Sequence, residues 1–166
     1  MTDGSIANGR PRFIVDHNAG KLARWLRMMG FDCLFFTGAD DGDMVRRALA
    51  EDRVIVTRDT GVAKRRLATR GQVRVVLLHD ERPERQMRQV NDALGLPSMV
   101  RPFTRCIECN TVLVPRTPEE VRDRVPPYVY RTQTRYVECP GCGRIYWQGT
   151  HWEAMMRRLA TLNAVP

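Results

Sequence analysis

The sequence lacks an apolar run long enough to cross a bilayer. A membrane helix needs about 18 or more consecutive apolar residues, and no stretch of these 166 residues approaches that length. The first eleven residues, MTDGSIANGRP, also contain no apolar segment of the kind that directs secretion. We therefore expect a cytoplasmic protein that does not contact a membrane.

Lysine is almost absent from the chain, although the net charge of the chain is +8. Two of the 27 basic residues, Lys21 and Lys64, are lysines, so the remaining 25 are arginines. The planar guanidinium group of arginine suits phosphates and stacked bases, which favours a nucleic-acid partner. The base composition of the genome is an alternative explanation for this bias, and the charge alone does not decide between the two.

Cysteine is also scarce, with five residues, but four of them form two C-x-x-C pairs. The stretch RCIECN contains Cys106 and Cys109, and ECPGCG contains Cys139 and Cys142. Two such pairs complete the tetrahedral shell of a structural Zn²⁺ ion, because each tight turn directs two thiolates toward one point. We expect zinc, with an iron–sulfur cluster or two redox-active dithiols as the alternatives. In a reducing compartment, disulfides are not expected.

The first part of the chain alternates between strand patterns and helix patterns. The segment from 18 to 30, for example, places Leu22, Leu26 and Met29 on one helical face, with Gly30 positioned to end the helix. Alternating strands and helices predict an α/β fold with a parallel sheet flanked by helices. We expect strands at 12–15, 31–36, 53–57 and 73–78, and helices at 18–30, 40–52, 62–68 and 83–94.

Residues 95–103, GLPSMVRPF, form a natural boundary, because two prolines and a glycine interrupt them and the alternation stops there. We therefore predict a loose polar tail at 1–11, an α/β domain at 12–98 and a second module at 102–166. The second module contains both Cys pairs and a helical pattern from 151 to 162 that closes the chain. A unit of this size has little core of its own, so a bound metal would stabilise it.

An acidic residue follows three of the expected strands at their carboxyl ends. Asp16 follows RFIV, Asp59 follows VIVT and Asp80 follows VVLL. Ligands of open parallel sheets bind at this edge, so the three carboxylates can converge there. Carboxylate oxygens are the ligands that Mg²⁺ and Mn²⁺ prefer, and two such ions can promote hydrolysis of a phosphodiester. Asp is also a preferred residue at helix N-termini, so helix capping is the alternative explanation for each acid taken alone.

A further acid comes from the first turn of the second expected helix. Asp43 lies close to the same edge of the sheet, and Asp40 and Asp41 precede it in the run DDGD. We predict Asp43 as a ligand of Mg²⁺ or Mn²⁺ together with Asp16 and Asp59, and we keep Asp40 and Asp41 as alternatives to it. A group of carboxylates repels itself unless a cation is bound, so their accumulation indicates a cation site.

Basic and aromatic side chains surround both features and predict contacts to RNA. Arginines bind phosphates, and aromatic faces stack on the bases of single strands. The aromatic residues also serve the core of so small a module, which makes the arginines the firmer part of this prediction. The predicted RNA-binding residues are Lys21, Arg24 and Arg27 on the first helix, Arg58 after the third strand, and Arg105, Arg135 and Arg144 around the Cys pairs.

Several of these segments resemble a known family. The motifs VDHN at 15–18, DDGD at 40–43 and VTRD at 56–59 resemble those of a PIN-type nuclease domain. With GKLARWLRMMGFD, RCIECN, VPPYVY and ECPGCGRIYWQGTHW added, the chain resembles the family named for the C-terminal RNase domain of the Mut-seven exonuclease. That family combines a PIN-like fold with a zinc ribbon. The resemblance covers roughly residues 12–155, and the order of the motifs makes it specific.

The resemblance implies a metal-dependent ribonuclease whose acidic residues hold Mg²⁺ or Mn²⁺. Asp16 and Asp59 match the first acid and the acid of the TRD motif. Asn18 matches the small polar residue two positions after the first acid, and we add it to the RNA-binding set. PIN domains often have Glu where this chain has Asp43 or its neighbours, and Asp80 is placed by its strand and matches no motif. RNA, with tRNA as one candidate, is the implied partner, and a homodimer is compatible with the resemblance because PIN domains often pair.

We therefore expect a metal-dependent ribonuclease that hydrolyses RNA at Asp16, Asp43, Asp59 and Asp80, with the zinc ribbon aiding substrate binding. The alternative is a non-catalytic RNA-binding adaptor with a zinc ribbon. A receiver-like phosphoacceptor fits less well, because no adjacent pair of acids follows the first strand and no lysine follows a later one. DNA stays open as a substrate, since these acids contact phosphates and do not read the 2′-hydroxyl group.

Overall fold

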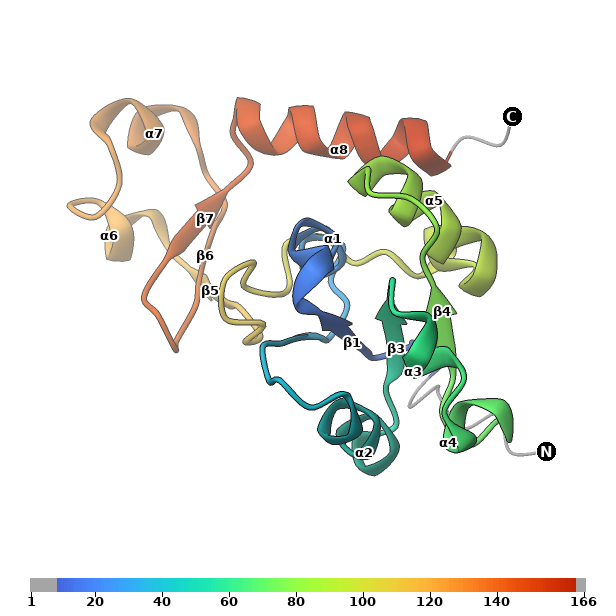
Figure 1. Ribbon diagram of the computed structural model, residues 1–166. Coiled ribbons are helices and arrows are strands. Elements are labelled where there is room, and N and C mark those ends of the chain that lie inside the picture. Colours follow the sequence, from blue (N-terminus) through green and yellow to red (C-terminus); the bar gives the residue numbers. More distant parts are fainter. Residues whose placement is uncertain (1–8, 164–166) are drawn as a thin grey trace.

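A four-stranded parallel sheet forms the centre of the computed structural model, which describes residues 9–163 (Figure 1). The strands are β1 (Phe13–Asp16), β2 (Cys33–Phe36), β3 (Val54–Thr57) and β4 (Val75–Leu77). They pair in the order β2-β1-β3-β4, and all three pairings are parallel. The alternation of strand and helix patterns predicted this parallel sheet, and the structure confirms it.

Helices cover both faces of the sheet, because successive side chains of a strand point to opposite sides. The first face carries α1 (Gly20–Met28) and α5 (Pro83–Leu94), and the second carries α2 (Asp41–Glu51), α3 (Thr60–Ala63) and α4 (Arg66–Thr69). Phe13 and Val15 of β1 are buried with α1 and α5, whereas Ile14 is buried with α2. The helices and the sheet therefore form three layers (Figure 1).

Gly30 ends α1, as its position in the sequence predicted. The N–H groups of Gly30 and Phe31 donate to the carbonyl groups of Arg27 and Leu26, at 2.9 and 3.0 Å, which completes a Schellman motif. Gly30 has a φ of +89°, and a Cβ atom there would lie 2.0 Å from the carbonyl oxygen of Arg101. Any side chain at this position would therefore push α1 away from the segment that leads to the Cys pairs.

The single helix expected at 62–68 is two short helices, α3 and α4. Arg65 separates them because its backbone is extended, with a φ of −64° and a ψ of 148°. The first of the two helices also starts earlier than predicted. The carboxylate of Asp59 caps it by accepting a hydrogen bond from the N–H group of Gly61, at 2.7 Å.

Residues 9–11, the part of the predicted tail that the structure describes, are bound to the rest of the protein. Residues 1–8 lie outside the described part of the chain, but Pro11 is buried. The guanidinium group of Arg10 donates to the carbonyl oxygens of Met99 and Gly30, at 3.0 and 3.1 Å, and lies 4.9 Å from the ring centre of Phe31. The prediction of a loose tail up to residue 11 is therefore wrong for its last residues, because a single arginine joins them to two distant loops.

A second, antiparallel sheet forms the four-cysteine module, which comprises residues 102–149. Its strands, paired in sequence order, are β5 (Val114–Arg116), β6 (Tyr136–Glu138) and β7 (Ile145–Trp147). Between β5 and β6 lie two short helices, α6 (Pro118–Val121) and α7 (Pro127–Thr132). They bury Val121 and Val129 against Tyr136, whose hydroxyl group donates to the carbonyl oxygen of Val129 at 3.0 Å. The long spacer between the two Cys pairs is therefore a folded insertion.

The closing helix, α8 (Thr150–Asn163), packs on the α/β domain. It passes over α1 toward α5 (Figure 1), where Leu159 is buried in the main core and Arg158 forms an ion pair with Glu84. This contact corrects the predicted boundary, which assigned the helix to the second module, because Leu159 is buried in the core of the α/β domain and Met155 and Met156 pack against that core. Within residues 9–163, neither α8 nor any other helix is long and apolar enough to span a membrane.

Candidate active site and metal centre

The carboxyl ends of β1 and β3 form the edge of the sheet at which the strand order reverses. The chain leaves β1 toward β2 on one side, and continues from β3 to β4 on the other. Ligands of open α/β sheets bind in the crevice at such a switch point. Asp16 is the last residue of β1, and Asp59 follows the end of β3 by two residues. Both acids therefore lie at the edge where the sequence predicted them.

Asp16 is held by two hydrogen bonds, one to each carboxylate oxygen. Its Oδ1 accepts from the backbone N–H group of Asn18, at 2.8 Å, and its Oδ2 accepts from the hydroxyl group of Thr57. The same Thr57 oxygen accepts from the N–H group of Asp59, at 3.0 Å. Thr57 is fully buried and Asp16 is 6% exposed. One hydroxyl group thus fixes the carboxylate of Asp16 and the backbone of Asp59 relative to each other.

The acids at this edge also cap helices, as the alternative explanation proposed. Asp16 caps the short 3-10 helix that precedes α1, Asp59 caps α3, and Asp40 caps α2 by accepting from the N–H group of Gly42 at 2.7 Å. Each cap uses one carboxylate oxygen, Oδ1, in all three residues. The other oxygen lies outside the cap, so capping does not exclude a role in binding a cation.

Asp41 is the residue of the DDGD run that lies beside Asp59. The pKa of Asp41 is raised, and burial is the largest cause. A hydrogen bond to the Asp59 carboxylate and the charge of that carboxylate raise it further, and the charge of Asp16 adds a smaller effect in the same direction. The predicted residue, Asp43, is exposed and forms an ion pair with Arg46. This placement corrects the prediction for Asp43, because the first turn of α2 directs Asp41 toward the sheet edge. We call Asp16, Asp41 and Asp59 the acid cluster.

Asp80, the predicted fourth acid, has arginine partners. Its carboxylate accepts from the backbone N–H group of Arg82, at 2.8 Å, and from the guanidinium group of Arg85, at 3.1 Å. The N–H group of Arg82 is the main cause that lowers the pKa of Asp80. Within residues 9–163, these two arginines are the partners of its carboxylate. The structure therefore does not join Asp80 to the acid cluster.

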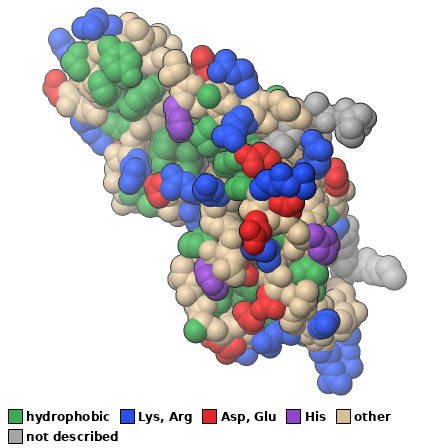
Figure 2. All heavy atoms as spheres, turned by 45° about the horizontal axis from the view of Figure 1, so that its top comes forward, with side chains coloured by type: hydrophobic (Ala, Val, Ile, Leu, Met, Phe, Trp, Pro, Cys, Tyr) green, Lys and Arg blue, Asp and Glu red, His purple; other side chains and the backbone are tan. Residues whose placement is uncertain are grey.

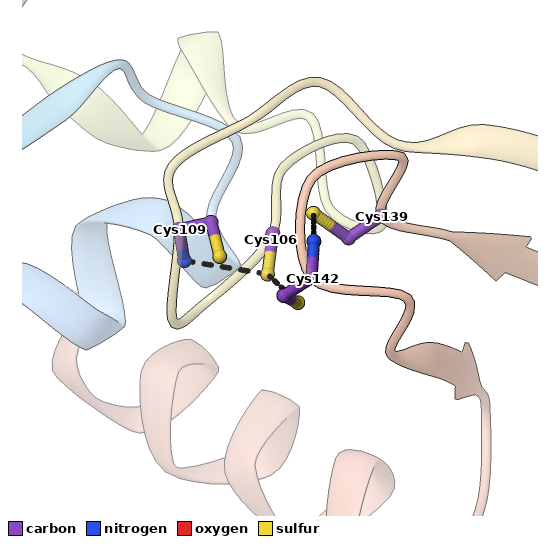
Figure 3. A group of neighbouring side chains, drawn as sticks. All are labelled: Cys106, Cys109, Cys139 and Cys142. Carbon is purple, nitrogen blue, oxygen red and sulfur yellow. Dashed lines mark hydrogen bonds between the residues drawn. The ribbon is translucent and has the colours of Figure 1, made fainter.

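The four predicted zinc ligands do converge. The Sγ atoms of Cys106, Cys109, Cys139 and Cys142 all lie within 4.8 Å of one another (Figure 3). The Sγ atoms of Cys106 and Cys142 are 3.8 Å apart. Four sulfur atoms placed tetrahedrally around Zn²⁺ at about 2.3 Å would be about 3.8 Å from one another. The cluster therefore has the size of a four-cysteine zinc site and can hold that ion.

Backbone N–H groups point at the thiols of the first cysteine in each pair. Those of Cys109 and Cys142 lie 3.4 Å from the Sγ atoms of Cys106 and Cys139 (Figure 3). Burial opposes ionisation of Cys139, but donors led by the N–H group of Cys142 outweigh it and lower its pKa to about 7. The hydroxyl group of Tyr146 also lies 3.1 Å from the Sγ atom of Cys106. Such donors favour thiolates, the form that binds metal.

The acid cluster is more open than the thiol cluster. Among the residues that the structure describes, the carboxylate oxygens of the acid cluster do not all lie within 4.8 Å of one another, whereas the four Sγ atoms do. A wider spacing suits Mg²⁺, which keeps several water ligands and needs one or two protein carboxylates. Among the described residues, the acid cluster therefore lacks the close convergence of the four thiols.

Arg27, predicted to bind RNA, is buried between the two parts of the protein. Its Nε donates to the carbonyl oxygen of Cys33, at 2.8 Å. One terminal nitrogen donates to the carbonyl oxygens of Ile107 and Glu108, at 3.0 and 3.1 Å, which lie between the first two cysteines of the thiol cluster. Arg27 therefore attaches the first Cys pair to the α/β domain, and this position corrects the expectation that it contacts RNA.

Arg105 also stabilises the fold and is not free to contact RNA. Its guanidinium group is half-buried and donates to the carbonyl oxygen of Asn110, at 2.9 Å. The side chain of Asn110 continues the connection, because it donates to Asp32 at 2.8 Å and accepts from the N–H group of Cys33 at 2.9 Å. We therefore remove Arg105 from the set of RNA-binding candidates as well.

The remaining predicted RNA-binding residues are exposed. Arg24 pairs with Glu108 at 2.8 Å, and Arg58 pairs with Glu81 at 3.0 Å. Arg135 lies 5.4 Å from the ring centre of Phe103. The other three, Asn18, Lys21 and Arg144, also have exposed side chains.

Sequence reasoning missed two residues near the acid cluster. Thr57 is the residue that orients Asp16, and its signal was its place at the end of a strand, two residues before an acid. The charge of Arg65 acts on Asp41, which places a cation at the cluster. Its signal was the run of three basic residues, Lys64 to Arg66, that follows the TRD motif and that the sequence analysis assigned only to a helix.

The model of the Mut7-C RNAse domain family matches residues 11–159, which include the acid cluster and all four clustered cysteines. No curated protein and no solved structure matches the chain.

Proposed function

Because the chain belongs to the Mut7-C RNase domain family, we propose that it is a ribonuclease whose acid cluster binds Mg²⁺ or Mn²⁺. The observation that carries this proposal is the position of Asp41 beside Asp59 and near Asp16, at the switch point of the sheet. The three carboxylates come from three different elements, and burial, followed by the hydrogen bond and charge of Asp59, raises the pKa of Asp41. A divalent cation would offset that charge.

The residues of the cluster have separable roles in this proposal. Asp16 is preoriented by Thr57, so its carboxylate does not need to reorganise when a cation binds. Asp59 and Asp41 supply further oxygens from the N-terminal ends of α3 and α2. A bound divalent cation would activate water and offset the negative charge of the phosphodiester. Arg65 is positioned to bind a phosphate oxygen beside the cluster.

The thiol cluster has a structural role in this proposal. It holds Zn²⁺, and the ion fixes the two turns that carry the Cys pairs. Arg27 of α1, the helix that follows Asp16, donates hydrogen bonds to the first of these turns and so connects the zinc site to the α/β domain. Thiols that bind zinc must stay reduced, which is consistent with a cytoplasmic location.

The experiment that tests the function uses zinc-loaded protein from which other divalent ions have been removed. It is incubated with single-stranded RNA, tRNA and single-stranded DNA, with and without Mg²⁺ or Mn²⁺, and the products are separated by size. We expect RNA cleavage that requires the added ion and is lost in Asp16→Asn. Binding of RNA without cleavage under any of these ions would instead support the adaptor, in which the acids serve only as helix caps. Cleavage of DNA at the same rate would broaden the substrate class.

A further inference from the structure

Four adjoining hollows lie in a row between Asn18, two residues after Asp16, and the four-cysteine module. The first, of about 280 Å³, is lined by Asn18, whose N–H group is bonded to Asp16, and it shares Lys21 with a second hollow of about 430 Å³. The second shares Arg24 with a third, of about 310 Å³. The third shares Arg144 with a fourth, of about 350 Å³, on the four-cysteine module. We call this row of hollows the α1–α8 groove.

Basic side chains border the groove along its whole length. Lys21 and Arg24 come from α1, Arg158 from α8 and Arg144 from the turn before β7. Figure 2 shows this face, on which Lys and Arg side chains, with Asp and Glu side chains among them, lie around an area of hydrophobic side chains. In the part of the chain that the structure describes, no side-chain hydrogen bond or ion pair involves Lys21 or Arg144. Among the described residues, Lys21 and Arg144 are therefore cations without a direct ion pair at the two ends of the groove, and the nearest lining acids are Glu81 and Glu84 in the hollows of Lys21 and Glu108 in a hollow of Arg144.

The two other basic residues of the groove have exposed acidic partners. Arg24 pairs with Glu108 and Arg158 pairs with Glu84, and the side chains of both arginines are more than half exposed, at 56% and 63%. Exposed pairs of this kind contribute about 0–1 kcal/mol. A phosphate can therefore replace the carboxylate at little cost, and the bordering charge is complementary to a polyanion.

Aromatic rings lie along the groove between the basic residues. Trp25 lines the hollow near α1, while Tyr146, Trp147 and Trp152 line the hollow that reaches the four-cysteine module. Trp152 is held edge-to-face against Phe103, with ring centres 4.9 Å apart, so it is fixed in the absence of a ligand. Phosphate-binding side chains alternating with partly exposed aromatic rings are the features that bind single-stranded nucleic acid.

We propose that the α1–α8 groove is the path of single-stranded RNA between the four-cysteine module and the acid cluster. This inference rests on the proposed ribonuclease function for the identity of the nucleic acid, and it adds the route and strandedness of the substrate. A single strand fits because its bases can turn onto Trp147, which lines two of the hollows, whereas the bases of a duplex are stacked inside it. The phosphates then contact Arg144 at one end and Lys21 at the other, and the strand continues past Asn18 to the acid cluster.

The test measures binding of oligouridylates of about 4 to about 16 nucleotides to zinc-loaded protein at several salt concentrations. Asp59→Asn serves as the background, since an asparagine can still cap α3 and cleavage is expected to be lost. Lys21→Gln and Arg144→Gln remove one positive charge each from opposite ends of the groove. Arg157→Gln and Arg131→Gln are matched controls, because both arginines are exposed and neither lines the groove.

We expect affinity to rise with length until the groove is filled. Each groove variant should lower the slope of log K against log salt concentration by about 0.7, the value for one phosphate contact of a single strand. The controls should leave the slope unchanged, and duplex RNA should compete poorly. Equal slopes in groove variants and controls, or duplex binding as tight as that of the single strand, would overturn the proposal.

The outcome of this test is separate from that of the proposed function. If the wild-type protein cleaves RNA with added metal, but the Lys21 and Arg144 variants bind RNA as tightly as the controls do, the proposed path is wrong and the proposed ribonuclease function stands. Binding that depends on both residues, without cleavage under any ion, would support the path and overturn the ribonuclease.

Discussion

The hydroxyl group of Thr57 donates a hydrogen bond to the carboxylate of Asp16 across the two central strands of the sheet. Both side chains are almost inaccessible to solvent, at 0% and 6% exposure. A buried carboxylate is stable only when its oxygens have hydrogen-bond partners. The bond therefore supports the fold and also fixes the oxygen atom that the proposed cation would use.

Replacement of Thr57 by valine tests this relationship, because valine keeps the volume and removes the hydroxyl group. The Thr57→Val protein should lose about 1.5–3 kcal/mol of stability, the value of a hydrogen bond to a charged group. Its affinity for Mn²⁺ should also fall, since Asp16 is no longer oriented. Urea unfolding and isothermal titration with Mn²⁺ measure the two effects. Thr57→Ser, which retains the hydroxyl group, should recover most of both, and equal losses in the two variants would contradict this role.

Asp41 and Asp43 differ by two positions and provide a matched pair of variants. Asp41→Asn removes a member of the acid cluster, whereas Asp43→Asn removes the exposed partner of Arg46. We expect Asp41→Asn to weaken Mn²⁺ binding and cleavage by about 10- to 100-fold, the range found when groups around a bound metal are removed. Asp43→Asn should behave as the wild type. The reverse ranking would restore the residue that the sequence analysis selected.

Arg27 should affect stability, and the neighbouring Arg24 on the same helix is its control. Arg27→Met leaves buried carbonyl groups of Cys33 and the first Cys pair without a donor, so we expect a loss of about 3 kcal/mol. Arg24→Met breaks an exposed ion pair and should cost less than about 1 kcal/mol. Chemical denaturation of zinc-loaded protein measures both values. Similarly small losses of stability in the two variants would show that Arg27 does not join the α/β domain to the four-cysteine module.

Removal of zinc should destabilise the whole chain. The first Cys pair is hydrogen-bonded to the α/β domain through Arg27, so disorder at the thiols reaches α1. A structural zinc site contributes several kcal/mol, and a loss of about 4 kcal/mol lowers the melting temperature by about 10 °C in a chain of this size. Metal analysis should find one zinc ion per chain in the wild type and in Cys33→Ala, and none in Cys142→Ser.

A protein that retains full stability after chelation, or a Cys33→Ala protein without zinc, would contradict this assignment. The comparison is informative because Cys33 is buried in the main core, whereas Cys142 belongs to the thiol cluster. Iron in place of zinc in the purified protein would support the iron–sulfur alternative.

The features that sequence patterns predicted correctly depend on neighbouring residues. The parallel sheet follows from alternating strand and helix patterns, and Gly30 marks the end of α1 because only a residue without a side chain fits there. The spacing of the two Cys pairs likewise predicted the convergence of Cys106 with Cys142. In each case the signal lies in a short stretch, such as a glycine after a helical pattern or a C-x-x-C pair, even though Arg101 and Cys142 are distant in sequence from Gly30 and Cys106.

The features that the sequence did not reveal depend on distant residues. Arg27 looks like the exposed Arg24 in sequence, and its partner Ile107 is 80 residues away. The choice among the acids of the DDGD run depends on how the first turn of α2 faces Asp59, which no local pattern encodes. The docking of α8 on α5 is a long-range contact of the same kind.

The most direct test of the account compares single-turnover cleavage of RNA by three zinc-loaded proteins in the presence of Mn²⁺. These are the wild type, Asp59→Asn from the acid cluster, and Asp80→Asn, whose carboxylate is held by Arg82 and Arg85. We predict that Asp59→Asn lowers the rate by about 100-fold with unchanged zinc content, and that Asp80→Asn cleaves at close to the wild-type rate. A wild-type rate in Asp59→Asn, or a loss confined to Asp80→Asn, would contradict the assignment of the acid cluster as the active site.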